Sequence, residues 1–226
     1  MAHTGVSDPI ADYIAALSAR LRGPSSAKAD LLAEARDGLD DAAEAYAAAG
    51  HPDPRGRAVA EFGDLTCLAR AYQAELGVAE GARALKSVLV AVPVMHALWQ
   101  TNQLVWIGSW SEYGGPVPEW YRAVADVNDW IGWVVMGLAG LALLAGRLLS
   151  RRGVETRRLG RAAGFLGAAG SFVLLLNLVV LLTATASLDM SRLLMPLPCL
   201  AVGAGMFIVH GRILVLAHRS LKFTAG

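Results

Sequence analysis

Apolar residues follow two different patterns along the chain. Up to about residue 80 they recur every three or four positions between charged residues, as Ile10, Ile14, Leu17 and Leu21 do. This spacing places them on one face of an amphipathic helix. Beyond residue 85 the apolar residues form runs long enough to cross a bilayer core of ~30 Å. The pattern predicts an all-α protein, with a small cytosolic helical bundle in residues 1–83 followed by a four-helix transmembrane bundle in residues 84–226.

Turn and capping signals divide residues 1–83, here called the head, into four expected helices. These signals are Asp8-Pro9, Gly23-Pro24, Gly50, Pro52-Asp53-Pro54 and Gly63-Asp64. An acidic N-cap followed by proline begins a helix well, and a glycine after an apolar stripe commonly ends one. The second helix, from residue 25 or 26 to Ala49, is expected to be the longest. Gly77 and Gly81 are expected to loosen the connection to the membrane part.

The second helix carries an apolar stripe and an acidic stripe on different faces. Leu31, Ala35 and Leu39 belong to the apolar stripe, which is expected to be buried. The acidic stripe keeps the same spacing of four and three and consists of Asp30, Glu34, Asp37, Asp41 and Glu44. A solvated helix face is one interpretation of such a stripe. A docking surface for a protein partner is the other.

Four apolar segments in residues 84–226 are expected to cross the membrane. They cover residues 87–107, 131–149, 162–186 and 193–216. The acidic segment 108–129 is expected to be an outer loop, and the tryptophans around it favour the membrane–water interface. The first span is the most polar of the four. A re-entrant or surface helix is therefore the alternative for that segment.

Three polar side chains stand out inside these spans. His96 and Gln100 share a helical face of the first span, and we expect them to point into the bundle because a polar group facing lipid is costly. Asn177 lies near the middle of the third span. It is expected to form a hydrogen bond with a neighbouring helix, and a proton or ion site is the other interpretation.

Small residues at intervals of four predict a close helix contact in the membrane part. Gly160, Gly164 and Ala168 form such a strip at the start of the third span, and Ala142 and Gly146 form another in the second span. Small side chains allow two helix backbones to approach closely. These two spans are therefore expected to pack together.

Charge orients the chain relative to the membrane. Residues 147–161 hold six arginines against one glutamate. Basic residues in short loops mark the cytoplasmic side, so both termini are expected in the cytosol of a bacterial inner membrane. No cleaved signal peptide is visible before the first apolar run. The head has eight basic and thirteen acidic residues, whereas residues 84–226 have twelve and six. Such an acidic head is a poor direct binder of nucleic acid.

Motifs for common enzyme chemistries are missing from the sequence. It contains no phosphate-binding Gly-x-x-x-x-Gly-Lys-Ser/Thr, no His-Glu-x-x-His, no Gly-x-Ser-x-Gly and no Cys-x-x-Cys. The two cysteines, Cys67 and Cys199, fall in different regions and predict no disulfide. We therefore expect no catalytic residues, no metal and no cofactor. Four spans without strong intramembrane charge also argue against an independent transporter.

The head resembles the bacterial permease prefix domain, also known as the HAAS (helix-turn-helix-associated alpha-helical signalling) domain. The resemblance covers about residues 8–80. It rests on the order and spacing of Leu31-Leu32-Ala33-Glu34, Asp37-Gly38-Leu39, Tyr46, Gly50, Arg57-Ala58-Val59 and Phe62-Gly63-Asp64. Gly38 stands where a histidine is common in that family.

The resemblance implies a role in signalling or regulation. Members of that family are typically cytosolic, precede membrane spans and are often encoded beside a PadR-like repressor, to which they are thought to relay a signal. We therefore expect a membrane-anchored regulatory protein whose head binds and modulates a PadR-like transcriptional regulator. Other members precede the membrane domains of ABC-type permeases, so an accessory subunit of a permease is the alternative. A homo-oligomer is left open.

Overall fold

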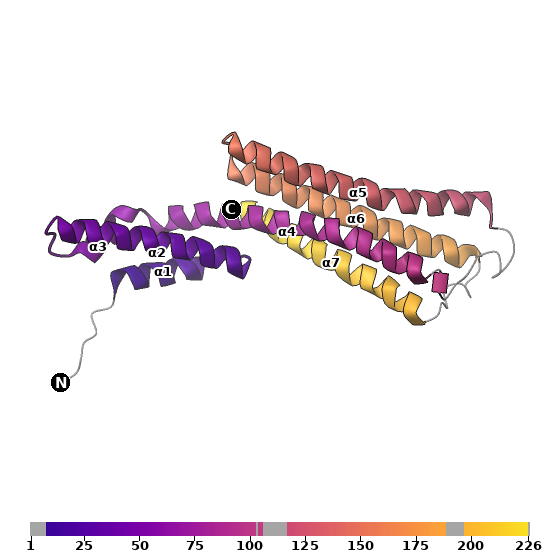
Figure 1. Ribbon diagram of the computed structural model, residues 1–226, viewed down its shortest axis with the longest axis horizontal. Helices are drawn as coiled ribbons and strands as arrows, with labels where there is room; N and C mark the ends of the chain where they lie inside the picture. Colours follow the sequence, from indigo (N-terminus) through magenta and orange to yellow (C-terminus); the bar gives the residue numbers. More distant parts are fainter. Residues whose placement is uncertain (1–7, 103, 106–116, 189–196, 226) are drawn as a thin grey trace.

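The computed structural model describes residues 8–102, 104–105, 117–188 and 197–225 of the 226-residue chain. The described residues form seven helices and no strand, which confirms the all-α prediction. The helices are arranged as an elongated rod (Figure 1). Their bounds are α1 (Pro9–Arg20), α2 (Ser25–Ala48), α3 (Pro54–Phe62), α4 (Leu65–Asn102), α5 (Glu119–Arg151), α6 (Thr156–Leu188) and α7 (Leu197–Ala225).

The head is a small bundle of α1, α2, α3 and the first part of α4, with its own apolar core. Leu17, Leu39 and Leu76 are fully buried there and come from three different helices. The predicted boundaries of α1, α2 and α3 and the predicted start of α4 agree with the structure to within one or two residues. The reason is local, because Asp8 caps α1 by accepting a hydrogen bond from the backbone N–H of Ile10, and Gly63 ends α3 with φ of 116°.

An ion-pair cluster joins the start of α1 to α2 and α3. Arg55 donates to both carboxylate oxygens of Asp8, at 2.8 and 2.9 Å, and also lies 3.2 Å from Asp40. The Arg55 hydrogen bonds lower the pKa of the Asp8 carboxyl. Because these groups are exposed, the cluster fixes the arrangement of the helices more than it adds to stability.

The connection between head and membrane part is a single unbroken helix. α4 runs from Leu65 to Asn102, so the expectation that Gly77 and Gly81 loosen the join is wrong. Both glycines are buried. The same helix contributes Leu76 to the core of the head and Leu85 to the core of the membrane part. Head and bundle therefore share one rigid element.

The second part of α4 lies beside α5, α6 and α7, and the four segments alternate in direction (Figure 1). α5, α6 and α7 are each long and apolar enough to cross a membrane. The segment of α4 from residue 87 does not meet that criterion, although Val90, Val94 and Leu98 expose apolar surface on it. The described residues thus contain three candidate spans, which supports a membrane protein.

α5 begins earlier than the sequence predicted. It starts at Glu119, so residues 119–129 of the expected outer loop are helical. Trp120 is exposed on this extension, and Trp130 is exposed directly after it. Pro118 precedes the helix and fixes a backbone conformation that suits its entry. The remaining part of the expected loop up to residue 116, Gln103 and residues 189–196 before α7 lie outside the described residues.

The close helix contact is also found at a place other than the predicted one. A Cβ atom added at Gly164 would come within 3.0 Å of Ser220 and Leu221 of α7, whereas one added at Gly146 meets nothing within 4 Å. The strip on α6 therefore packs most closely on α7 and on Gly81 of α4. The second and third spans, α5 and α6, do lie against each other as expected, and Ala142 packs against the same core cluster as Ala168, but Gly146 is not part of a close approach. The physical reason is that α6 presents its small residues to the two helices that cross it nearest the head.

Candidate functional site

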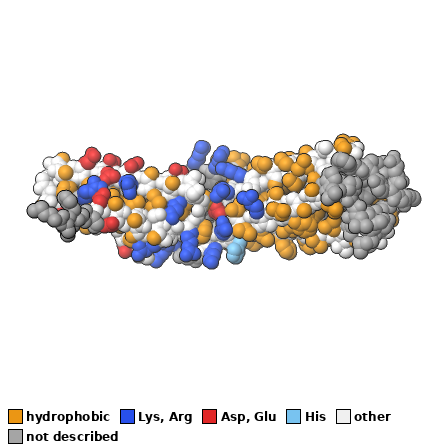
Figure 2. All heavy atoms as spheres, turned by 90° about the horizontal axis from the view of Figure 1, so that it is seen from below, with side chains coloured by type: hydrophobic (Ala, Val, Ile, Leu, Met, Phe, Trp, Pro, Cys, Tyr) orange, Lys and Arg blue, Asp and Glu red, His pale blue; other side chains and the backbone are white. Residues whose placement is uncertain are grey.

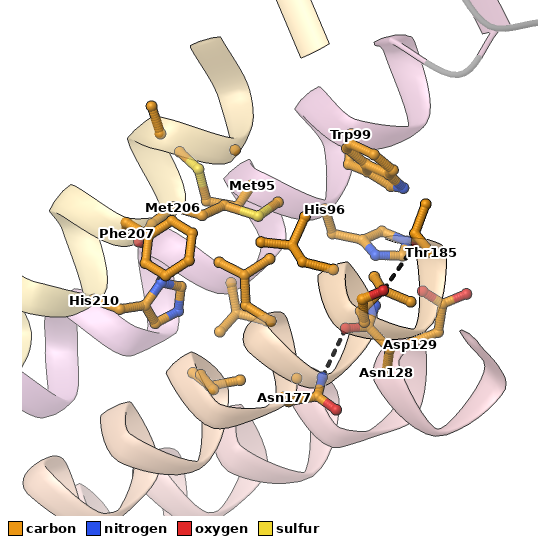
Figure 3. A pocket seen from close by; sticks show the side chains of 18 of the residues that line it. Met95, His96, Trp99, Asn128, Asp129, Asn177, Thr185, Met206, Phe207 and His210 are labelled. Atoms are coloured by element: carbon orange, nitrogen blue, oxygen red, sulfur yellow. Dashed lines mark hydrogen bonds between the residues drawn. The ribbon is translucent and has the colours of Figure 1, made fainter. Parts of the chain in front are cut away.

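A pocket of about 410 Å³ lies between α4, α5, α6 and α7 in the membrane part. Its walls are mainly apolar, with Met95, Met206 and Phe207 among the lining residues. Figure 3 shows Phe207, Met206 and His210 on one side and Asn128, Asp129 and Thr185 on the opposite side. An apolar cavity with a few convergent polar groups is the usual form of a binding site for a small molecule.

Hydrogen bonds between α5 and α6 organise the polar side of the pocket. The Asn177 Nδ2 donates to the Asn128 Oδ1 at 2.7 Å (Figure 3). The Tyr121 and Thr185 hydroxyls lie 2.9 Å apart and share a second hydrogen bond. The first contact confirms that Asn177 bonds a neighbouring helix. Asp129 lines the same side of the pocket and brings a carboxyl group to it.

Two histidines line the pocket from α4 and α7. His210 is buried, and its Nδ1 lies 2.7 Å from the Met206 carbonyl oxygen. Because a carbonyl oxygen can only accept, this nitrogen donates, and in the neutral ring the other nitrogen is left as an acceptor. His96 packs edge-on against Trp133, with ring centroids 5.3 Å apart, and its Nε2 lies 3.4 Å from the Gln100 Nε2.

The structure brings together two of the three intramembrane residues that the sequence singled out. His96 and Asn177 line the pocket, whereas Gln100 is exposed and contacts only His96 among them. Sequence reasoning missed Asp129 and His210 as members of this site. Asp129 could have been found if residues 119–129 had been read as helix, because Tyr121, Asn128 and Asp129 then fall on one face.

The acidic stripe of α2 lies at the far end of the molecule from this pocket. Its five residues, Asp30, Glu34, Asp37, Asp41 and Glu44, are all exposed, and Figure 2 shows acidic side chains gathered on the head. The opposite face of α2 buries Ala35, Leu39 and Ala43 in the core of the head. Within the described part of the chain, none of the five carboxylates forms an ion pair.

Several other acidic residues of the head form ion pairs with arginines. Arg55 binds Asp8 and Asp40, and Arg57 pairs with Glu61. The acidic stripe is therefore a part of the negative charge of the head that no ion pair neutralises among the described residues.

The stripe extends toward α4 through Glu75. Burial raises the pKa of the Glu75 carboxyl, and the negative charge of Glu34 raises it further. The pKa of the Tyr72 hydroxyl is also raised, first by burial and then by Glu34 and Glu75. These shifts indicate that the carboxylates of α2 and α4 act on each other, so the acidic surface spans two helices.

Among the described residues no group of three or more His, Cys, Asp or Glu side chains is placed to hold a metal ion.

Comparisons of the chain with protein-family models, with curated proteins and with solved structures found no match.

Proposed function

We propose that the protein is a membrane-anchored regulatory protein whose head binds a cytosolic transcriptional regulator of the PadR-like class. The observation that carries this proposal is the acidic stripe of α2, whose five exposed carboxylates have no internal ion-pair partner in the described part of the chain. The resemblance of residues 8–80 to the permease prefix domain supplies the class of regulator.

The negative charge of the acidic stripe favours binding to a basic surface of the regulator. A DNA-binding protein needs a basic surface, because phosphate contacts from Lys and Arg dominate its affinity for DNA. The acidic stripe offers carboxylates to that same surface, so head and DNA compete for the regulator. Complementary charge mainly raises the association rate and the specificity, and salt screens it. Binding to the head is therefore expected to weaken as the salt concentration rises.

The continuous α4 offers a route from the membrane part to the head. At the crossing of α4, α6 and α7 the Ser220 hydroxyl lies 2.7 Å from the Gly77 carbonyl oxygen and 3.2 Å from that of Gly160. α4 also contributes His96 to the intramembrane pocket. A ligand that moves α4 relative to α6 and α7 moves the head with it, because α4 is one helix from the pocket to the head, with Pro93 as its interior proline.

The same proposal includes four membrane spans with both termini in the cytosol of a bacterial inner membrane. It is supported by the alternating directions of the four bundle segments, which bring the head, the α5–α6 connection and the chain end to the same end of the bundle (Figure 1). The arginines of residues 147–161 lie at that end, as the positive-inside rule requires of a cytoplasmic loop.

Cysteine labelling tests this topology in intact cells. Because Cys67 is an exposed free thiol, it and Cys199 are first replaced by Ser. Single cysteines at Glu119 and Ser187 are expected to react with an impermeant reagent, and ones at Ser150 and His218 are expected to stay protected. All four positions are exposed on the protein, so protection reports the membrane and not burial. Protection at Glu119 would remove α4 from the set of spans.

Binding of the regulator is tested with the full-length protein in nanodiscs. In one variant Asp37→Lys and Asp41→Lys reverse two charges of the acidic stripe. The matched control carries Glu119→Lys and Asp126→Lys, which make the same change of charge. Both residues are exposed and lie near the start of α5, far from the head. The stripe variant is expected to bind a PadR-like regulator of the same organism at least tenfold more weakly at low salt, and the control to bind normally. Equal binding by both variants contradicts the proposal.

A further inference from the structure

A second concave site lies where the head meets the bundle. It is a cleft of about 870 Å³ between the end of α1, the first part of α4 and the last turns of α7. Seven basic side chains line it, namely Arg20, Arg22, Arg70, Arg83, Arg212, Arg219 and Lys222. Figure 2 shows Lys and Arg gathered in a band between the acidic head and the apolar bundle. Neither the acidic stripe nor the intramembrane pocket includes these residues.

Most of the basic residues of this cleft have no ion-pair partner among the described residues. Among the described residues Glu80 is the one acidic residue that lines it, and its carboxylate is almost fully buried and lies 3.5 Å from the Arg83 guanidinium. The other six basic residues form no ion pair within the described part of the chain, and all six are exposed. Six unpaired cations around one cavity favour an anion with more than one negative charge.

The position of the cleft favours a lipid as the source of that anion. α7 is a candidate membrane span up to Phe223, and Leu216 and Phe223 form apolar parts of the cleft wall. On the same helix Val215 and Ile208 are 50% and 64% exposed, so apolar surface continues from the cleft along the bundle. A phospholipid can place its phosphate among the arginines and its acyl chains along this surface. A soluble anion would contact the arginines and leave the apolar surface uncovered.

We propose that this cleft binds the headgroup of an anionic phospholipid that carries two phosphates, and so ties the head to the membrane surface. Arg70 and Arg22 approach the headgroup from the head, and Arg212, Arg219 and Lys222 approach it from α7. Guanidinium groups suit this role because their planar donors match the oxygens of a phosphate. The lipid thus links the head to the bundle. The backbone connects these two parts only through α4.

The test uses full-length protein in detergent, with bound lipids counted by native mass spectrometry. The probes are diphosphatidylglycerol and phosphatidylcholine with identical acyl chains, and inorganic pyrophosphate serves as a soluble competitor. Diphosphatidylglycerol is expected to bind at least tenfold more tightly than phosphatidylcholine. Pyrophosphate at equal concentration is expected to leave the lipid bound. Similar affinities for the two lipids overturn the proposal, and displacement by pyrophosphate assigns the cleft to a soluble diphosphate.

Variants locate the binding in the cleft. Changing Arg212, Arg219 and Lys222 to Gln is expected to weaken binding of diphosphatidylglycerol by ~100-fold, since each basic residue near anionic lipid contributes about fivefold. The matched control changes Arg147, Arg151 and Arg152 to Gln, which removes three exposed charges outside the cleft.

Arg70→Gln on the head side of the cleft is a second variant and leaves α7 unchanged. It is expected to weaken binding about fivefold. An equal loss in the matched control, or unchanged binding in either cleft variant, overturns the proposal. The result is independent of the regulator, because no regulator is present in the measurement.

Discussion

The crossing of α4, α6 and α7 provides a sharp test of the packing. A Cβ atom added at Gly81 would lie 2.9 Å from the Ala163 Cβ, 2.9 Å from the Ser220 Oγ and 3.3 Å from the Gly164 backbone nitrogen. These neighbours are short side chains and backbone, which cannot turn away as a long flexible side chain can. Gly81→Ala therefore forces the helices apart although it adds a single carbon atom.

The expected cost of Gly81→Ala follows from two opposing contributions. Overpacking of a close contact costs about 1–3 kcal/mol. Replacing glycine by alanine inside a helix returns about 1 kcal/mol. The net effect is a destabilisation of about 0–2 kcal/mol. Gly81→Val should cost more, because its two additional methyl groups meet the same fixed neighbours.

A matched substitution isolates the packing effect. An added Cβ atom at Gly137 in α5 meets nothing within 4 Å, so Gly137→Ala should keep the helix gain and pay no packing cost. The assay is thermal unfolding of each full-length variant in the same nanodisc, followed by circular dichroism. Unfolding temperatures should fall in the order Gly137→Ala, Gly81→Ala, Gly81→Val. If Gly81→Ala is as stable as Gly137→Ala, the close crossing of the three helices is refuted.

Three further variants test individual contacts. Arg55 lowers the pKa of Asp8 below 3.8, so the stability that this pair contributes is present above that pH and lost as the pH falls through the lower folded pKa. Asp8→Asn should therefore lower the unfolding temperature at pH 7, and the difference should shrink as the pH is lowered below 3.8. Burial raises the pKa of Glu75 above 4.5, so stability falls as the pH rises from 4.5 through the folded pKa; Glu75→Gln should stabilise the head at pH 8 and not at pH 4, and a gain equal at both pH values would be unexpected. Asn177→Ala removes the 2.7 Å hydrogen bond to Asn128 and should lower the free energy of unfolding by about 0.6–2 kcal/mol. A double-mutant cycle with Asn128→Ala should show coupling between the two residues, and additive effects would show that the bond does not form.

The helices of the head could be predicted from the sequence because their ends are set locally. Asp8 caps α1 through its own side chain, and Gly63 ends α3 in a conformation with positive φ that glycine adopts readily. The apolar stripe of α2 was also predictable, and Leu39 is fully buried as its spacing indicated. Such features depend on neighbours close in the chain.

The connection and the pocket could not be predicted in the same way. Gly77 and Gly81 look like helix breakers in the sequence, but they are places where α6 and α7 approach α4 closely, and only the positions of Ser220 and Ala163 reveal this. His96 stood out because it is polar within an apolar run. Asp129 did not stand out, because a loop was expected there and most of the other residues that line the pocket come from distant parts of the chain.

The most direct test of the proposed function measures the affinity of a PadR-like regulator for its operator DNA. Full-length protein in nanodiscs is added to the regulator and DNA at low salt, and the fraction of bound DNA is followed by fluorescence anisotropy. The acidic stripe should displace the DNA, and the Asp37→Lys, Asp41→Lys variant should not. Unchanged DNA binding in the presence of saturating unmodified protein would contradict competition through the acidic stripe.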